Sequence, residues 1–260
     1  MARSPRHMLI ALAMGWAIGM GGTARAADEE IQVYLNEIGA PHRLGLDLHV
    51  NYVPSGDGTL DYPGAQSGLH RLRVTPEFSY ALDDHFELGT YLPLTTLDAS
   101  GTLRVDGWKL RLKWLGSHSE HGLFYGVNYE IGRVASRLDQ NAWNNEVKLI
   151  AGWDSDTWII GANANLGFAL SGPAKTPADV TLTTKLGYKL SKDTTVGVES
   201  YNGLGTIRRV GHFFDNDQST FVAIDSRVGR WDVNFGVGKG YGSSKDDVIV
   251  KLIIGVPFGT

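Results

Sequence analysis

Residues 43–53 read Arg-Leu-Gly-Leu-Asp-Leu-His-Val-Asn-Tyr-Val, and apolar side chains occupy every second position from Leu44 to Tyr52. Between them lie Gly45, Asp47, His49 and Asn51. A period of two residues is that of a β-strand, in which successive side chains point to opposite faces. The stretch therefore predicts a strand with one apolar face and one polar face.

The same alternation recurs along the chain, each time over about ten residues and each time followed by a turn. Twelve segments carry it: 43–53, 71–80, 86–94, 108–114, 123–131, 143–153, 158–168, 180–190, 196–201, 220–227, 231–238 and 248–258. Pro76 interrupts the second, and we expect a bulge there because proline lacks a ladder donor. Segments of this kind and number predict an all-β protein, a single antiparallel transmembrane β-barrel of about 12 strands.

The connections between these segments alternate in length. The short ones are 82–85, 116–121, 154–157, 191–194 and 229–230, and the longer ones are 54–68, 95–103, 135–142, 170–179 and 203–219. The last connection, 241–246, is short although it falls among the longer set. Short periplasmic turns with longer extracellular loops are typical of outer-membrane barrels.

Aromatic residues give a further indication of a membrane. Trp143 and Trp153 lie on one face of their segment, and ten residues of tilted strand span roughly 25 Å, the height of the apolar band between two aromatic girdles. Trp114, Trp153, Trp158, Tyr188 and Trp231 adjoin short turns, whereas Tyr52, Trp108, Tyr129, Trp143 and Phe168 lie towards the long loops. A periplasmic barrel or sandwich with an apolar core is the alternative fold, but it gives no reason for two aromatic belts.

The N-terminus predicts export. Arg3 and Arg6 precede an apolar run to Met20, and Ala24-Arg25-Ala26 matches the site after which a signal peptidase cuts. We expect residues 1–26 to be a cleaved signal peptide, 27–42 an N-terminal extension and 43–260 the barrel. The extension is either a periplasmic tail or a partial plug.

Composition narrows the possible partners. Without Arg3, Arg6 and Arg25 the mature chain has 21 basic and 28 acidic residues, which disfavours a nucleic-acid partner. There are no cysteines and hence no disulfides, and the sequence predicts no cofactor. The expected partners are outer-membrane lipids and lipopolysaccharide, the barrel assembly machinery and a small-molecule solute.

Four stretches carry a family resemblance: 73–80 (RVTPEFSY), 87–94 (ELGTYLPL), 229–238 (GRWDVNFGVG) and 253–258 (IIGVPF). They resemble the outer-membrane transporter family labelled for the MetA pathway of phenol degradation. The resemblance implies a barrel that passes small molecules, including aromatic ones, and it implies no site residues. Gly259 and Thr260 follow Phe258, whereas many outer-membrane barrels end on the aromatic residue that serves as an assembly signal.

Function depends on the polar face, which a membrane barrel turns towards its lumen. The residues predicted to line the lumen and set selectivity are Arg71, Arg73, Lys109, Arg111, Lys113, Glu130, Glu199, Asp225, Asp232 and Asp47. We expect the basic ones to form one wall and Glu199, Asp225 and Asp232 to lie nearly opposite, which would set up a transverse field. Other charged residues blur this division: Glu77, Glu87, Glu146, Lys148, Lys185, Arg227 and Lys251.

Three functions compete. The first is a channel for small polar or aromatic solutes through a narrow charged lumen, and the second is a non-conducting barrel, filled by its own charge pairs, that displays loops such as 54–68 and 203–219 for adhesion. The third is a lipid hydrolase, which needs a Ser–His pair facing lipid. His49 falls in the lumen set, and 117–121 (SHSEH) is predicted to be a solvated turn rather than a metal site. We therefore predict a protein that is not an enzyme.

Overall fold

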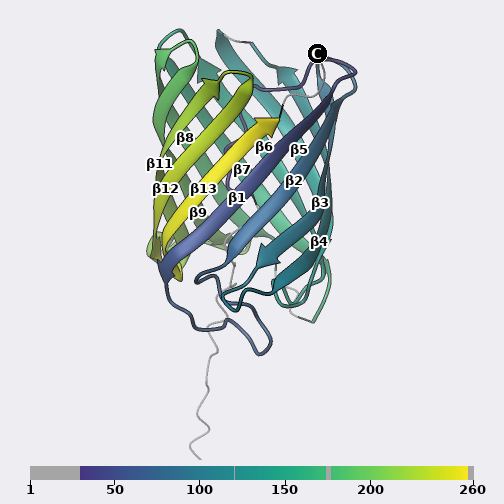
Figure 1. The fold of residues 1–260 in the computed structure, drawn as a ribbon, viewed down its shortest axis with the longest axis vertical. Helices are drawn as coiled ribbons and strands as arrows, with labels where there is room; N and C mark the ends of the chain where they lie inside the picture. Colours follow the sequence, from purple (N-terminus) through teal and green to yellow (C-terminus); the bar gives the residue numbers. More distant parts are fainter. Residues whose placement is uncertain (1–29, 120, 174–176, 257–260) are drawn as a thin grey trace, which may run out of the picture.

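The computed structural model describes residues 30–119, 121–173 and 177–256, which form a closed β-barrel (Figure 1). Twelve long strands make the ring: β1 (Leu44–Gly56), β2 (Leu72–Ala81), β3 (Phe86–Leu97), β4 (Leu103–Ser117), β5 (Gly122–Val134), β6 (Trp143–Asp154), β7 (Trp158–Ser171), β8 (Asp179–Ser191), β9 (Thr194–Thr206), β11 (Asp217–Val228), β12 (Trp231–Gly242) and β13 (Asp246–Val256). Each pairs antiparallel with its neighbours, and β1 pairs with β13 to close the ring. The predicted all-β barrel of about 12 strands is confirmed.

Every predicted segment corresponds to a strand, but most strands are longer. The segment predicted at 108–114 is part of β4, and 196–201 is part of β9. Backbone hydrogen bonds to neighbouring strands continue through glycines and polar residues that break the apolar alternation, so the pattern underestimates strand length. The predicted loop 203–219 also contains a two-residue strand, β10 (Arg209–Val210), and a 3-10 turn, η1 (Phe213–Asp215).

The apolar half of each strand faces outwards. Leu149 is 53% exposed, and Leu110 and Val237 are exposed to a similar extent, whereas the neighbouring Lys148 is 7% exposed. A barrel with an apolar core would show the reverse. The outward apolar surface is the one that lipid acyl chains cover in a membrane barrel.

Aromatic side chains pair across strands near both ends of the barrel. Trp158 and Tyr188, beside short turns, have ring centroids 4.9 Å apart, and Trp108 and Trp143, towards the loops, have centroids 5.6 Å apart. Both contacts are edge-to-face, the arrangement that aromatic quadrupoles favour. The two pairs lie where the sequence predicts the two belts.

Pro76 produces the expected bulge on one side of β2. Its pairing with β1 is regular, with Leu48 opposite Pro76. The pairing with β3 shifts register between Val74 and Glu77. The proline, which has no N–H to donate, therefore interrupts the ladder only on the β3 side.

The connections have the predicted asymmetry. Those at one end are 82–85, 118–121, 155–157, 192–193 and 229–230, and those at the other are 57–71, 98–102, 135–142, 172–178, 207–216 and 243–245. The β1–β2 connection forms the large loop at the bottom of Figure 1. Among the described residues, no helix has the length and hydropathy to cross a bilayer. The predicted signal peptide and the C-terminal Phe258, Gly259 and Thr260 lie outside the described residues.

Residues 30–43, the N-terminal segment, precede β1; residues 30–36 are buried or half-buried inside the barrel, and residues 39–43 are exposed. Val33, Tyr34 and Leu35 are buried in an apolar cluster with wall residues Leu115, Phe124, Ile150 and Ile159. Ile31 packs in a second cluster with Val53, Phe221 and Ile249. These contacts hold residues 31–35 against the inner wall; the role of the extension as a plug remains a prediction.

Candidate functional site in the barrel lumen

Tyr34 anchors the N-terminal segment to three strands. Its amide donates to Asn163 Oδ1 at 2.8 Å, and Asn163 Nδ2 donates to its carbonyl at 2.8 Å. Its hydroxyl lies 2.8 Å from the Tyr91 hydroxyl and donates to Glu130 Oε1 at 3.3 Å. The main chain and the side chain of one residue are thus fixed to β7, β3 and β5.

Wall side chains also bind the backbone of the segment at other points. Lys251 Nζ donates to the Ile31 carbonyl at 3.1 Å, and Lys113 Nζ donates to the Glu37 carbonyl at 2.8 Å. The Gly39 amide donates to Glu87 Oε2 at 2.9 Å. These bonds provide buried partners for a stretch that forms no ladder with the barrel.

Arg111 is the centre of the first charge network. It lies 2.6 Å from Glu77 and 2.8 Å from Glu87, and Lys113 lies 3.0 Å from Glu87. His49 Nε2 lies 3.0 Å from the second oxygen of Glu77. All five side chains are buried, so each charge is compensated within the lumen.

Glu199 is the centre of the second network. Lys185 lies 3.1 Å from Glu199 and 2.7 Å from Asp225, and Lys251 also pairs with Glu199. The Tyr201 hydroxyl donates to Glu199 at 2.7 Å. Lys185 on β8 and Asp225 on β11 thus pair with each other across β9, which lies between the two strands.

Glu130 links a third group. Lys109 and Lys148 each lie 3.7 Å from it, and Lys148 lies 3.3 Å from Glu146. The Lys148 ammonium also lies 4.2 Å from the centre of the Tyr34 ring, a cation–π contact. This group joins the N-terminal segment to β4, β5 and β6.

Arg111 on β4 lies five strands round the ring from Glu199 on β9 and six from Asp225 on β11, which is nearly opposite, as predicted. Both sides of the ring, however, also carry counter-charges of their own. Arg111, Lys113 and Lys109 pair with carboxylates one or two strands away. Asp232 lies 66% exposed beside the 229–230 turn, where it pairs with Arg227 at 2.8 Å. Local pairing costs less than leaving buried charges apart, so the basic residues are compensated near their own strand, and the transverse field remains a prediction. Asp47 faces the lumen half-buried.

Arg71 and Arg73 lie near the loop end of the lumen, and both are buried. Neither Nη atom of Arg71 has a hydrogen-bond partner among the residues that the structure describes. Asp246 is the carboxylate with the largest favourable electrostatic effect on Arg71.

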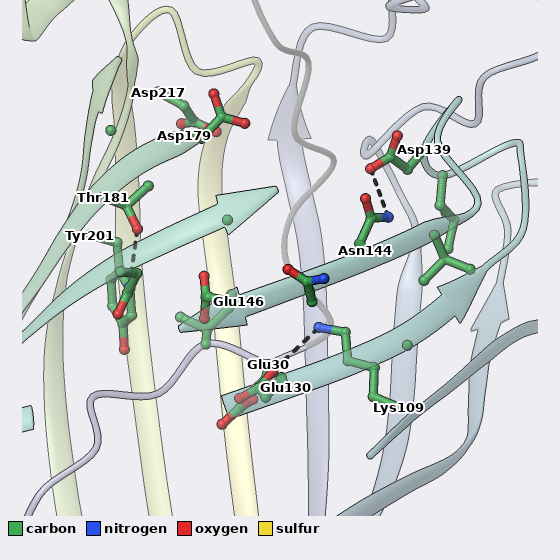
Figure 2. Close-up of a pocket in the computed structure, with 18 of the residues that line it drawn as sticks. Glu30, Lys109, Glu130, Asp139, Asn144, Glu146, Asp179, Thr181, Tyr201 and Asp217 are labelled. Atoms are coloured by element: carbon green, nitrogen blue, oxygen red, sulfur yellow. Dashed lines mark hydrogen bonds and ion pairs between the residues drawn. The ribbon is translucent and has the colours of Figure 1, made fainter. Parts of the chain in front are cut away.

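A cavity of 540 Å³, here called the vestibule, lies at the end of the lumen nearest the longer connections, next to the start of the N-terminal segment. Figure 2 shows polar side chains from several strands pointing into it, including Glu146, Thr181 and Asp139. Glu30 and Ile31, at the start of the described segment, form part of its lining. The vestibule therefore ends at the segment.

Loop 57–71 contributes to the vestibule and contacts loop 135–142. The Tyr62 hydroxyl donates to the Ser136 carbonyl at 2.8 Å, and the Gln66 amide donates to the Arg137 carbonyl at 2.8 Å. Partial burial, with the nearby carboxylates of Asp139 and Asp61, raises the pKa of Tyr62 to about 12. Tyr62 is thus a neutral hydrogen-bonding group at physiological pH.

The histidine-containing stretch 117–121 lies in the connection between β4 and β5. His121 faces Asp156 at 3.6 Å with both side chains exposed. Within 30–119, 121–173 and 177–256, no three His, Cys, Asp or Glu side chains are arranged to hold a metal ion. Glu120 lies outside those ranges.

Solved structures share this architecture. The COG4313 outer membrane channel from Pseudomonas putida F1 has a TM-score of 0.62 at 10% identity, over 87% of this chain and 99% of that one. The KdgM porin has a TM-score of 0.56 at 14% identity, over 83% and 99%, and the NanC porin 0.53 at 10%, over 83% and 100%. The fold is that of the outer-membrane β-barrels. At these identities the likeness concerns the fold alone.

Comparison of the sequence with known proteins does not identify a family for this chain. No family model matches, so the resemblance to the phenol-degradation transporter family is not confirmed. A curated relative, methylthioribulose-1-phosphate dehydratase from Klebsiella pneumoniae, is 29% identical over 116 residues, which are 41% of this chain. The chain spans about half the length of that relative, 54%.

Sequence reasoning did not single out Asn163, Tyr91 and Tyr34, which fix the segment. One signal was present: Ile31, Val33 and Leu35 alternate with Gln32 and Tyr34, like a short strand. Alternation outside the ring is a sign that the extension needs apolar partners of its own.

Proposed function

We propose that this protein is an outer-membrane channel whose lumen is closed by its own N-terminal segment and opens when that segment moves. The observation that carries the proposal is that polar residues line a vestibule at one end of the lumen, while Val33, Tyr34 and Leu35 of the N-terminal segment pack against the walls deeper inside. A barrel that served only as a scaffold would need neither a polar vestibule nor a segment docked inside the lumen.

Displacement of the segment is physically reasonable because its bonds are exchangeable. They join the segment to wall side chains such as Asn163, Lys113 and Lys251. Each such bond contributes about 0.5–1.5 kcal/mol net, or about 1.5–3 kcal/mol where a charged lysine donates. The paired charges of the wall do not depend on the segment for their compensation. The wall can therefore stay folded when the segment leaves.

The cargo supported by the lining is small and polar. Charged groups and amides surround the vestibule, and its volume suits a small molecule. The rings of Tyr62 and Tyr201 are available to aromatic solutes, which is what the family resemblance would require. Contacts between the solute and the residues that line the vestibule determine which of these solutes pass.

The proposed location is the bacterial outer membrane. The signal-like residues 1–26, the outward apolar surface and the aromatic belts support export and insertion into the outer membrane by the barrel assembly machinery, in contact with lipids and lipopolysaccharide. The proposal includes no catalytic step, because the one histidine in the lumen set, His49, is held by Glu77.

The test is a reversible tether between segment and wall. A Cβ placed on Gly161 would lie 3.7 Å from Leu35 Cγ, the position that the sulfur of a cysteine at 35 would take. The chain has no cysteine of its own, so Leu35→Cys with Gly161→Cys gives one defined disulfide. Planar-bilayer conductance of the refolded protein is measured oxidised and then reduced in the same sample.

The expected result is a closed channel when oxidised and openings when reduced. The single variant Leu35→Cys, treated identically, controls for the reductant. Equal conductance in the two states would show that passage does not need the segment to move. Absence of conductance in wild type at any voltage, with no solute uptake into liposomes, would reject the channel itself.

One observation favours loop display as a second candidate. In the connection between β9 and β11, Phe214 is 71% exposed, and Ile207, Val210 and Phe213 are exposed beside Arg208 and Arg209. An apolar and basic loop of this kind can bind a partner or lipopolysaccharide phosphates. Removal of residues 207–215 should abolish such binding and leave conductance intact.

A further inference from the structure

The vestibule has an excess of negative charge. Among the described residues that line it, eight are acidic (Glu30, Asp61, Glu130, Asp139, Glu146, Asp179, Asp217 and Asp246) and three are basic (Arg73, Lys109 and Lys148). Glu130 lies between the two lysines, and Lys148 also pairs with Glu146. A cavity enclosed by low-dielectric walls strengthens the field of its net charge, which here attracts cations.

Buried acceptors without donors lie in the same cavity. Asn145 and Asn165 line it and are each 5% exposed, yet Asn145 Oδ1 and Asn165 Oδ1 have no hydrogen-bond partner. Glu30 also lines the cavity, and its Oε1 likewise has no hydrogen-bond partner. Buried polar atoms are nearly always paired in folded proteins, so three unsatisfied acceptors in one cavity indicate a ligand that donates hydrogen bonds.

The carboxylates are spread around the cavity rather than gathered at one point. Asp139 projects from loop 135–142, where it accepts bonds from the Asn141 amide at 2.7 Å and from Asn144 Nδ2 at 3.1 Å (Figure 2). Glu146 lies on β6, and Asp179 begins β8. Separated acceptors match a ligand with several N–H donors along a flexible chain better than a single compact metal ion.

We propose that the vestibule binds small organic cations that carry ammonium or guanidinium groups, and that these are the solutes the channel admits. The inference rests on the proposed channel function and names its substrate class. The net charge draws the cation in, and the acceptors of Asn145, Asn165 and Glu30 receive its N–H groups. Tyr62 also lines the cavity, and an aromatic ring there can form a cation–π contact with such a ligand.

The test measures binding separately from conduction. Spermidine, a linear triamine, is titrated by calorimetry into the refolded wild-type barrel in detergent, with benzoate as the anionic comparison. The variants are Asp139→Asn, Glu146→Gln and their combination, and Asp98→Asn, in loop 98–102 outside the cavity, is the matched control. Heat-modifiable migration on a gel verifies that each variant is folded.

Spermidine should bind wild type and Asp98→Asn equally, and the double variant should lose about tenfold or more in affinity, because two charge-assisted hydrogen bonds are removed. Raising the salt concentration should weaken binding. In bilayers, the reversal potential of wild type should indicate cation selectivity, and the double variant should reduce it.

The inference is overturned if benzoate binds more tightly than spermidine, or if the double variant binds spermidine as wild type does. Spermidine binding without conductance would reject the channel while supporting the site. Conductance without spermidine binding, or with anion selectivity, would leave the channel standing and reject the substrate class.

Discussion

The main chain of Tyr34 is held by the side chain of Asn163 through two hydrogen bonds of 2.8 Å, one in each direction. Asn163 is completely buried and lies on the inner face of β7. A side-chain amide that donates to a carbonyl and accepts from the adjacent amide imitates the pairing of a neighbouring strand. The N-terminal segment is thereby docked against the wall at one defined register.

Asn163→Ala should loosen the segment and raise the open probability of the channel. The change leaves the buried amide and carbonyl of Tyr34 without partners, at a cost of about 1–3 kcal/mol each in the closed state. Single-channel recording in planar bilayers measures the open fraction. Thr75→Ala, at a buried position on the inner face of β2, is the control because the Thr75 hydroxyl makes no hydrogen bond to residues 30–43. Equal effects of the two substitutions would contradict the docking role.

Gly161 and Leu35 should behave as a complementary pair. A Cβ on Gly161 would collide with Leu35 Cδ2, so Gly161→Val should expel the segment and increase conductance. Leu35→Ala should also increase it, because the apolar contact is lost. In the double variant the valine fills the space that the leucine left, and conductance should return towards wild type. Additive effects in this cycle would show that the two positions do not interact.

Arg111→Met should destabilise the barrel and not merely alter its selectivity. The substitution leaves Glu77 and Glu87, both buried, with less compensation, and removal of one partner from a buried ion pair costs about 3–5 kcal/mol. Urea unfolding in liposomes, followed by tryptophan fluorescence, measures the loss. Arg104→Met is the control, since Arg104 pairs with Asp98 in an exposed loop and should show little change. A stable Arg111→Met barrel with altered ion selectivity would restore the role first expected for Arg111.

The strands could be predicted because the alternation of apolar and polar residues within each strand shows that one face contacts lipid and the other faces the lumen. Leu44, Leu46 and Leu48 alternate with polar residues whether or not the partner strands are known, and a membrane barrel imposes that alternation on every strand. The girdle residues Trp143 and Trp153 carry the same local information. Fold class, strand count and the lengths of most connections follow from such local signals.

The partners of the lumen charges could not be predicted in this way. Arg111 stands opposite Glu130 in the β4–β5 register, yet its guanidinium pairs with Glu77 and Glu87 on β2 and β3. Such pairing depends on the relative shift of strands and on the curvature of the ring, neither of which alternation encodes. The docking of Tyr34 against Asn163, 129 residues away, is of the same long-range kind.

The outward face of β6 gives the last prediction, which concerns the membrane itself. Leu149 lies midway along β6 and is exposed on the outside, whereas Leu190, also exposed, lies at the end of β8 beside the 192–193 turn. Arginine on a lipid-facing site costs about 2–4 kcal/mol at the bilayer midplane and about 0–1 kcal/mol near the interface. Leu149→Arg should therefore lower the free energy of unfolding in liposomes by several times the effect of Leu190→Arg. Urea titration of both variants measures the difference. In a water-soluble barrel neither arginine would be penalised, so equal and small effects would place the outer face of β6 in water rather than in lipid.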